Sequence, residues 1–264
     1  MSGKSLSAVG LRTGLTETHL LGQRVICLQP ENGFRVAIDA VLLAAAVPAR
    51  PGQRAMDVGC GSGAAALCLA ARIDGVHVTG LERQPDLAEL ARRNAVLSGL
   101  AARVDVVSGD LLDPPDGVQG AAFDHVFANP PYMKPGTGQT PANRARALAT
   151  IEGLASLDNW LEFCLAHTTP SGTVTIVHRH DRLGDILDYL GDGQGRIAVM
   201  SLIPKQGAAP KRILVQVTKG QQGPITNLGG LILHEAGRKY TRVTEAILRH
   251  AQPLQMWEPG YVEG

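Results

Sequence analysis

The segment Asn129-Pro130-Pro131-Tyr132 combines groups that could hold an amine. Each proline fixes its φ angle and lacks an N–H donor, so the loop should be stiff and its carbonyl groups should point in set directions. The Asn129 side chain and the Pro130 carbonyl could accept two hydrogen bonds from a planar NH2 group, and Tyr132 could stack on the flat system that carries it. Two acceptors would align the poorly nucleophilic lone pair with an electrophile. The segment therefore predicts alkylation of an amide-like or aryl amine, and the alternative is a strand-ending turn with a buried tyrosine.

A second set of residues suggests a cofactor site. The stretch DVGCGSG lies between an expected strand and an expected helix, and its glycines are Gly59, Gly61 and Gly63. They allow the backbone to turn sharply and to approach a ligand at a helix N-terminus. Glu82 ends the next strand about twenty residues later, where a carboxylate can accept hydrogen bonds from ribose hydroxyls. The turn alone also suits tight strand-to-helix packing, and the spacing fits NAD as well as another adenosine cofactor.

Two aspartates stand where further acceptors would be useful. Asp110 ends a third strand in the triplet SGD and could accept a hydrogen bond from an adenine amino group. Its alternative role is to cap a helix formed by the residues that follow. Asp39 stands just before the apolar run 40–47, where it could cap a short buried helix.

Alternating strand and helix patterns predict the scaffold that positions these residues. The expected strands cover 54–58, 76–82, 103–110, 123–129 and 173–178, and the expected helices cover 64–73, 85–99 and 156–168. This repetition predicts an α/β fold with a parallel, doubly wound sheet and helices on both faces. Residues 195–204 and 211–219 should form an antiparallel pair that completes a seven-stranded sheet. Residues 230–235 could add a further short strand, and residues 240–251 a last helix.

The ends of the chain have a different character. Residues 1–20 are polar without a clear period and are compatible with partial disorder, whereas residues 23–38 resemble a hairpin around a Pro-Glu-Asn-Gly turn. We therefore expect four parts, which are a polar N-terminal segment (1–20), a hairpin and helix packed on the core (21–50), the main α/β domain (51–250) and a C-terminal tail (251–264).

The composition is that of an ordinary globular protein. Of the 264 residues, 44% are hydrophobic and 19% are charged, and the net charge is only +1, so any nucleic-acid-binding surface must be local. No apolar run is long enough to span a bilayer, and we expect no secretory signal. The four cysteines are dispersed, and His178 and His180 lack a third ligand nearby in the sequence. These observations predict a cytoplasmic protein without disulfides and without a metal site.

The combination of DVGCGSG, GLE, SGD and FANPPY resembles the class I S-adenosylmethionine-dependent methyltransferases that modify amino nitrogens. The resemblance implies a Rossmann-like fold whose sheet ends in an antiparallel hairpin. It also implies that the glycine turn, with Asp57 below it, holds the methionine part of the cofactor. Glu82 would bind the ribose and Asp110 would face the adenine. Asn129 to Tyr132 would hold the target amine, with Asn129 bordering the cofactor as well.

Within that group, the chain is similar to the tRNA1(Val) adenine(37)-N6-methyltransferase family over about residues 20–250. The similarity lies in FRVAIDAVLLAAAV, HRHDRLGDIL, KRILVQV and LILHEAGRKYT, and it implies that Asp39 lies beside the cofactor. It further implies methyl transfer from S-adenosyl-L-methionine to N6 of an adenosine next to a tRNA anticodon.

Other substrates and roles stay open. A family that methylates a release-factor glutamine also carries NPPY, but it resembles chains with a helical domain before the glycine turn, and here that region reads as a hairpin and a short helix. Adenine in ribosomal RNA or DNA, and a non-catalytic role in binding RNA or the cofactor, are further alternatives. A tRNA substrate would require local basic surface, because phosphates dominate affinity. The candidates are Arg144, Arg146, Lys205, Lys211, Arg212, Arg238, Lys239 and Arg242.

Overall fold

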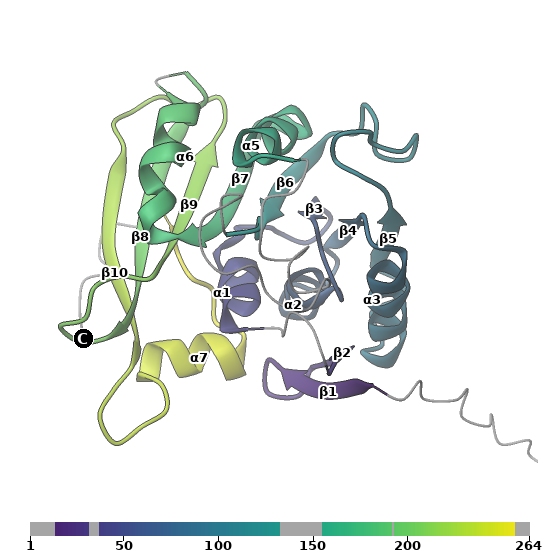
Figure 1. The fold of residues 1–264 in the computed structure, drawn as a ribbon, viewed down its shortest axis with the longest axis horizontal. Helices are drawn as coiled ribbons and strands as arrows, with labels where there is room; N and C mark the ends of the chain where they lie inside the picture. The colour runs from purple at the N-terminus through teal and green to yellow at the C-terminus, as the bar shows by residue number, and fades with distance from the viewer. Residues whose placement is uncertain (1–13, 32–36, 133–154, 192, 257–264) are drawn as a thin grey trace, which may run out of the picture.

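The computed structural model describes residues 14–31, 37–132, 155–191 and 193–256, and its central feature is a mixed sheet (Figure 1). The strands of this sheet are β3 (Arg54–Val58), β4 (His77–Glu82), β5 (Val104–Ser108), β6 (Phe123–Ala128), β7 (Thr168–Arg179), β8 (Arg196–Lys205), β9 (Arg212–Thr218) and β10 (Thr226–His234). Within the described chain their order is β10-β8-β9-β7-β6-β3-β4-β5. Every pairing is parallel except those of β9, which runs antiparallel to β7 and to β8.

This topology confirms a mostly parallel sheet with an antiparallel hairpin near its C-terminal end. The described sheet has eight strands where the sequence predicted seven, because β10 pairs in parallel with β8 over most of its length. The register of β10 shifts between Asn227 and Gly230, so its apolar alternation is interrupted in the middle of the strand. Because of this interruption, the sequence pattern indicated only the last part of the strand, residues 230–235.

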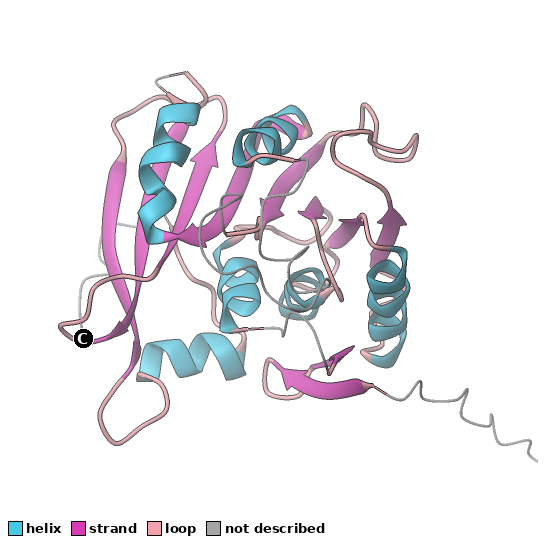
Figure 2. Cartoon of the chain, in the orientation of Figure 1, coloured by secondary structure: helices cyan, strands magenta, loops and turns pink. Residues whose placement is uncertain are grey.

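Helices cover both faces of the sheet, as expected (Figure 2). On one face lie α1 (Ile38–Ala46), α2 (Ala64–Arg72) and α3 (Pro85–Leu97), with α7 (Arg242–His250) packed beside α1. On the other face lie α5 (Leu157–Ala166) and α6 (Leu183–Leu190), the second of which the sequence did not predict as a helix. Successive residues of β3 point to opposite faces, so Ala55 joins the core beneath α1 and α2 whereas Met56 joins the core beneath α5.

Of the expected hairpin over residues 23–38, the structure describes the first strand and shows that Ile38, its last residue, begins α1. Residues 25–30 do form a strand, β2 (Val25–Pro30), but its antiparallel partner precedes it as β1 (Leu15–Leu20). The turn between them places Leu21 and Gln23 at φ values of 49° and 74°, which non-glycine residues seldom adopt. Only Gly22 between them, at a φ of 61°, is a typical turn residue, and β1 falls within a segment expected to be irregular. Residues 32–36, which the expected hairpin included, lie outside the described residues.

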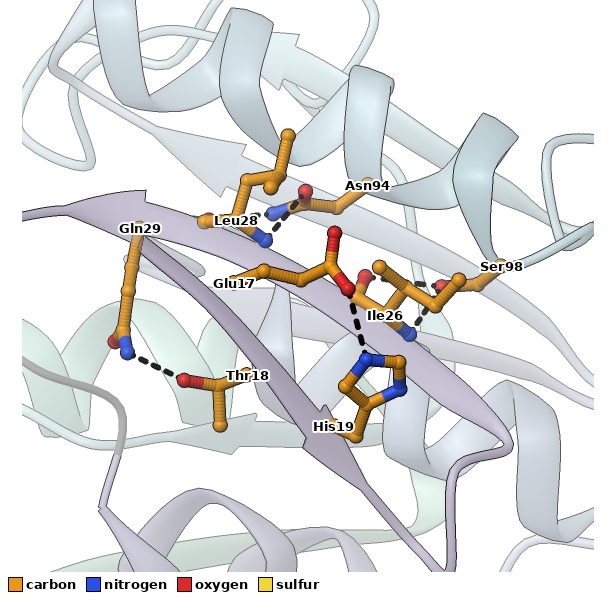
Figure 3. A network of polar contacts seen from close by, with 8 residues as sticks. All are labelled: Glu17, Thr18, His19, Ile26, Leu28, Gln29, Asn94 and Ser98. Carbon is orange, nitrogen blue, oxygen red and sulfur yellow. Dashed lines mark hydrogen bonds and ion pairs between the residues drawn. The ribbon is translucent and has the colours of Figure 1, made fainter. Parts of the chain in front are cut away.

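The β1–β2 ribbon is fixed to α3 by two polar side chains (Figure 3). Asn94 accepts a hydrogen bond from the Leu28 amide and donates one to the Leu28 carbonyl, both at 2.9 Å. Ser98 bonds in the same way to Ile26, at 3.0 and 3.1 Å. Asn94 also donates to the Ser62 carbonyl at 2.9 Å. The side chains of α3 thus satisfy backbone groups of β2 and connect the ribbon to the turn after β3.

The first part of the expected C-terminal tail is docked on the core. The Leu254 amide donates to the Ala45 carbonyl at 2.9 Å, and Leu254 and Met256 are both buried. Residues 257–264 lie outside the described residues. Within the described ranges, every helix is too short or too polar to cross a lipid bilayer.

Candidate active site

The carboxyl ends of three neighbouring strands bring the predicted site residues together. Val58 at the end of β3 is in register with Leu81 of β4 on one side and with Ala128 of β6 on the other. The glycine turn, Glu82 and Asn129 therefore meet at one edge of the sheet. The chain continues from β3 to β4 and β5 on one side and then crosses back to place β6 on the other side of β3, and such a switch point is where parallel α/β sheets bind ligands.

The glycine turn has a backbone that only glycine adopts readily. Gly59, Gly61 and Gly63 have φ values of 68°, 59° and 87°. The amides of Gly59 and Cys60 donate to the Leu81 carbonyl at 2.7 and 3.0 Å, which fixes the turn against the end of β4. A Cβ atom built on Gly61 would meet no atom of the described residues within 4 Å. The middle of the turn therefore faces open space, as a backbone that lines a ligand site should.

Gly59 is additionally constrained by Trp160 of α5. A Cβ atom on Gly59 would lie 2.4 Å from Cη2 of the indole. Trp160 itself is 9% exposed and belongs to the core beneath α5.

We expect Gly59→Ala to lower the unfolding free energy by about 3 kcal/mol, because the strained φ and the clash with a buried ring act together. Thermal denaturation followed by circular dichroism measures this loss. Gly61→Ala is the matched control, since it carries a similar φ penalty without the clash. Equal melting temperatures for the two variants would contradict the role assigned to Trp160.

Glu82 is oriented by the turn that it faces. One carboxylate oxygen accepts from the Gly61 amide and the other from the Gln84 amide, both at 2.8 Å. The side chain is buried, and burial raises its pKa, opposed by these two hydrogen bonds and by the Arg83 charge. The carboxylate is thus held at the open turn with acceptor capacity left for a ligand hydroxyl.

Asp57 lies beneath the turn and supports the start of α2. Its Oδ2 atom accepts from the Ala66 amide at 3.0 Å, which satisfies one of the N–H groups left unpaired at a helix N-terminus. Burial raises the pKa of Asp57 to about 8, opposed by this hydrogen bond and increased further by the Glu82 charge.

This shift predicts a pH-dependent stability difference between the protein and its Asp57→Asn variant. The folded state binds the Asp57 proton more tightly than the unfolded chain, whose pKa is about 3.8. The stabilisation is complete below pH 4 and is lost as the pH rises towards 8. Relative to the wild type, the variant should therefore gain melting temperature over this interval. A difference in melting temperature that stays constant from pH 4.5 to 8.5 would contradict the shift.

Asp110 follows β5 and has local partners. Its Oδ1 atom accepts from the Leu112 amide at 3.0 Å, and its Oδ2 atom lies 3.6 Å from Arg83 Nη1. The following described residues form a turn, so the alternative role as a helix cap is wrong. The side chain instead stabilises that turn, in which Asp113 donates its amide to the Asp110 carbonyl.

Asn129 presents a buried acceptor to the site. Its Oδ1 atom is buried and has no hydrogen-bond partner among the described residues. Such atoms are rare in folded proteins, because an unpaired buried polar group costs about 1–3 kcal/mol. Pro130 beside it is buried, and the Pro131 carbonyl accepts from His178 Nε2 at 3.3 Å. The arrangement fits a ligand that brings its own N–H donor.

Tyr132 is held by residues from distant parts of the chain. Its hydroxyl donates to Asp39 Oδ2 at 3.1 Å, and Arg212 Nε donates to the same oxygen at 3.2 Å. The Arg212 guanidinium lies 4.6 Å from the centre of the tyrosine ring, and His178 packs edge-on against it at 5.3 Å. The Arg212 guanidinium therefore covers one face of the Tyr132 ring.

The expected capping role of Asp39 is wrong. The N-cap of α1 is Ala37, and Asp39 lies in the first turn of the helix without a capping hydrogen bond. Its carboxylate is used instead to position Tyr132 and Arg212. Both partners are far away in the sequence, so no local pattern could indicate this role.

His178 belongs to the site, although the sequence was used only to argue against a metal ligand role for it. It is fully buried at the end of β7, and burial together with the Arg182 charge lowers its pKa to about 4. The imidazole is therefore neutral at pH 7, and it supports both Pro131 and Tyr132. In the described part of the chain, no three His, Cys, Asp or Glu side chains are grouped so that they could hold a metal ion.

The predicted basic residues occupy two places. Lys205, Lys211 and Arg212 lie at the ends of β8 and β9 that adjoin the site. A second group follows β10, farther along the same sheet, and consists of Arg238, Lys239 and Arg242. Arg144 and Arg146 lie outside the described residues.

Comparison with known proteins assigns the chain to a family. The family model of the methyltransferase small domain matches residues 35–149. The tRNA1(Val) (adenine(37)-N6)-methyltransferase of Porphyromonas gingivalis is 31% identical over 229 residues, which cover 80% of this chain and 88% of that protein. The enzyme of the same name from Aeromonas salmonicida is 30% identical, with coverage of 79% and 86%.

A solved structure agrees with the assignment. The crystal structure of the predicted O-methyltransferase Atu636 from Agrobacterium tumefaciens has a TM-score of 0.67 and 27% sequence identity, and it covers 82% of this chain and 98% of its own. These matches indicate S-adenosyl-L-methionine as the cofactor, and the open glycine turn with Glu82 at its rim fits an adenosine-containing ligand. The chain is therefore a methyltransferase that belongs to the tRNA1(Val) (adenine(37)-N6)-methyltransferase family.

Proposed function

We propose that this protein transfers a methyl group from S-adenosyl-L-methionine to N6 of an adenine in tRNA, at the adenosine next to the anticodon. The observation that carries the proposal is the buried, unpaired Oδ1 atom of Asn129 at the carboxyl edge of the sheet. The names of the family members, which specify adenine 37 of tRNA1(Val), support this substrate.

The cofactor would lie over the ends of β3 and β4. The glycine turn, supported by Asp57, would hold its methionine part, Glu82 would accept hydrogen bonds from the ribose, and Asp110 would face the adenine. Asp39, at the start of α1, would border the same space. When bound, the cofactor supplies an electrophilic methyl group.

The target amine would lie against the loop after β6. Asn129 Oδ1 and the Pro130 carbonyl would accept hydrogen bonds from the two N–H groups of the amine and orient its lone pair towards the methyl group. No strong base is required, because positioning and electrostatics are sufficient to activate the nitrogen. The face of Tyr132 opposite to Arg212 would stack on the adenine, which must leave its own stack in the RNA to reach the site.

The RNA would extend across the basic residues at the ends of β8 and β9, and towards those that follow β10. Arg144 and Arg146 complete the proposed RNA-binding set. A tRNA substrate also supports a cytoplasmic location.

Incubation with tritiated S-adenosylmethionine tests the proposal, with total unmodified tRNA and a release factor as parallel substrates. The expected result is label in the tRNA, recovered as N6-methyladenosine after nuclease digestion. Label in the release factor would replace the proposal with glutamine methylation. Label in neither substrate would overturn tRNA as the substrate and direct the search to ribosomal RNA, DNA or a binding role.

A further inference from the structure

A basic pocket lies directly beside Tyr132. It has a volume of about 480 Å³ and lies between the end of β7, the short helix η1 (His180–Arg182) and the start of β9. The residues that matter for its chemistry are Tyr132, Arg179, His180, Asp181, Lys211 and Arg212. Sequence reasoning set His180 aside and did not consider Arg179, because nothing in the sequence places these two beside Tyr132.

The cations of this pocket are fixed to different degrees. Arg179 forms two hydrogen bonds to the carboxylate of Asp181, one of them at 2.9 Å, and Arg212 is held by Asp39. Lys211 is exposed and, within the described residues, has no carboxylate partner. Three cationic side chains line the pocket together with the Asp181 carboxylate, and Asp39 pairs with one of them, so a net positive charge remains that would favour an anion.

We propose that this pocket binds a phosphodiester of the RNA substrate, the one that flanks the methylated adenosine. The inference rests on the proposed function and specifies how the RNA backbone is held. Tyr132 and Arg212 both line the pocket, and they also contact each other in the group that holds Tyr132 in place. A base stacked on Tyr132 would therefore have its own backbone within reach of the pocket. Arginine offers a fixed fork of N–H donors that suits phosphate oxygens, and lysine adds a mobile charge.

The position of the pocket separates it from the cofactor site. The glycine turn follows β3 and Glu82 ends β4, whereas the pocket lies beyond β6, at the ends of β7 and β9. A ligand there approaches the site from the side opposite to the cofactor. The amine to be methylated would then lie between the two, at the loop after β6.

The test compares variants that change one charge each, in the full-length protein. Fluorescence anisotropy measures the dissociation constant of a labelled unmodified anticodon stem-loop at several salt concentrations. Titration calorimetry measures the affinity for S-adenosylmethionine, and steady-state methylation gives KM for tRNA and kcat. The variants are Lys211→Ala and Asp181→Asn. Arg50→Ala is the control, because Arg50 is an exposed cation that precedes β3, at the opposite end of the strands.

Lys211→Ala should weaken RNA binding about fivefold at 0.1 M salt and reduce the slope of log Kd against log salt by about 0.7, the value for one single-strand phosphate contact. KM for tRNA should rise in parallel, with kcat and cofactor affinity unchanged. Asp181→Asn should act in the opposite direction, because it removes the carboxylate that competes for Arg179.

Two results would overturn the proposal that the pocket binds a phosphodiester. One is a salt slope for Lys211→Ala equal to that of Arg50→Ala, and the other is a change in cofactor affinity without a change in RNA affinity. Neither is confused with failure of the proposed function, which shows as absence of methyl transfer to tRNA by the wild-type protein before any variant is compared.

Discussion

Asn129→Ala is expected to lower kcat for tRNA methylation by about 1,000-fold, with cofactor affinity changed by less than about threefold. The buried Oδ1 atom has no partner among the described residues, so the substrate amine is the group that would use it. Removing one preorganised acceptor that strengthens its contact as the amine becomes pyramidal affects the transition state more than the bound substrate. Single-turnover methylation with saturating tRNA and cofactor measures the loss.

Asn129→Asp is the informative control for this result. It retains an acceptor of the same size beside Pro130 but adds a charge at a buried position. Activity of this variant between those of Asn129→Ala and the wild type would support the role of the oxygen atom. Wild-type turnover by Asn129→Ala would remove Asn129 from the reaction altogether.

Glu82→Ala should weaken S-adenosylmethionine binding by about 100-fold or more. The ribose hydroxyls would lose the carboxylate proposed to accept their hydrogen bonds. Hydrogen bonds to a charged group contribute about 1.5–3 kcal/mol each. The same change removes the acceptor of the Gly61 and Gln84 amides, so the turn proposed to hold the cofactor also loses its support. Titration calorimetry with the cofactor and with S-adenosylhomocysteine measures both effects as one dissociation constant.

Glu82→Gln separates the two contributions. A glutamine oxygen can still accept from one of the two amides, so the turn should be partly retained while the charge is lost. We expect its cofactor affinity to lie between those of the wild type and Glu82→Ala. Cofactor binding by Glu82→Ala with wild-type affinity would exclude Glu82 from the ribose site.

Elements with a strong local pattern were predictable from the sequence. The strand Arg54–Val58 was predicted to the residue, and Ala64–Arg72 and Pro85–Leu97 agree within one or two residues at their ends. Each carries its own signal, such as a continuous apolar run or a proline in the first turn followed by a glycine after the last. The meeting of the glycine turn, Glu82 and Asn129 at one edge follows from the parallel arrangement of these strands.

The parts that could not be predicted depend on contacts between distant segments. The ribbon turn at Leu21 and Gln23 has no turn residues at its strained positions, and β1 gains its order from β2, which α3 anchors. Tyr132 is held by Asp39 of α1 and by Arg212 of β9, and no sequence pattern connects these two residues. Arg212 was assigned only to RNA binding for the same reason.

The position of β9 determines when the two halves of the site can form as the chain is synthesised. β9 is made after β8 but lies between β7 and β8, so these two strands cannot take their final places until β9 has entered the sheet. The glycine turn and Glu82 lie on strands β3 and β4, which are synthesised well before β9. Arg212, the first residue of β9, lies over the Tyr132 ring and donates to the Asp39 carboxylate that also binds the tyrosine hydroxyl. A nascent chain that ends before residue 212 therefore already contains the residues proposed to bind the cofactor but lacks the arginine that holds Tyr132, on which the base is proposed to stack.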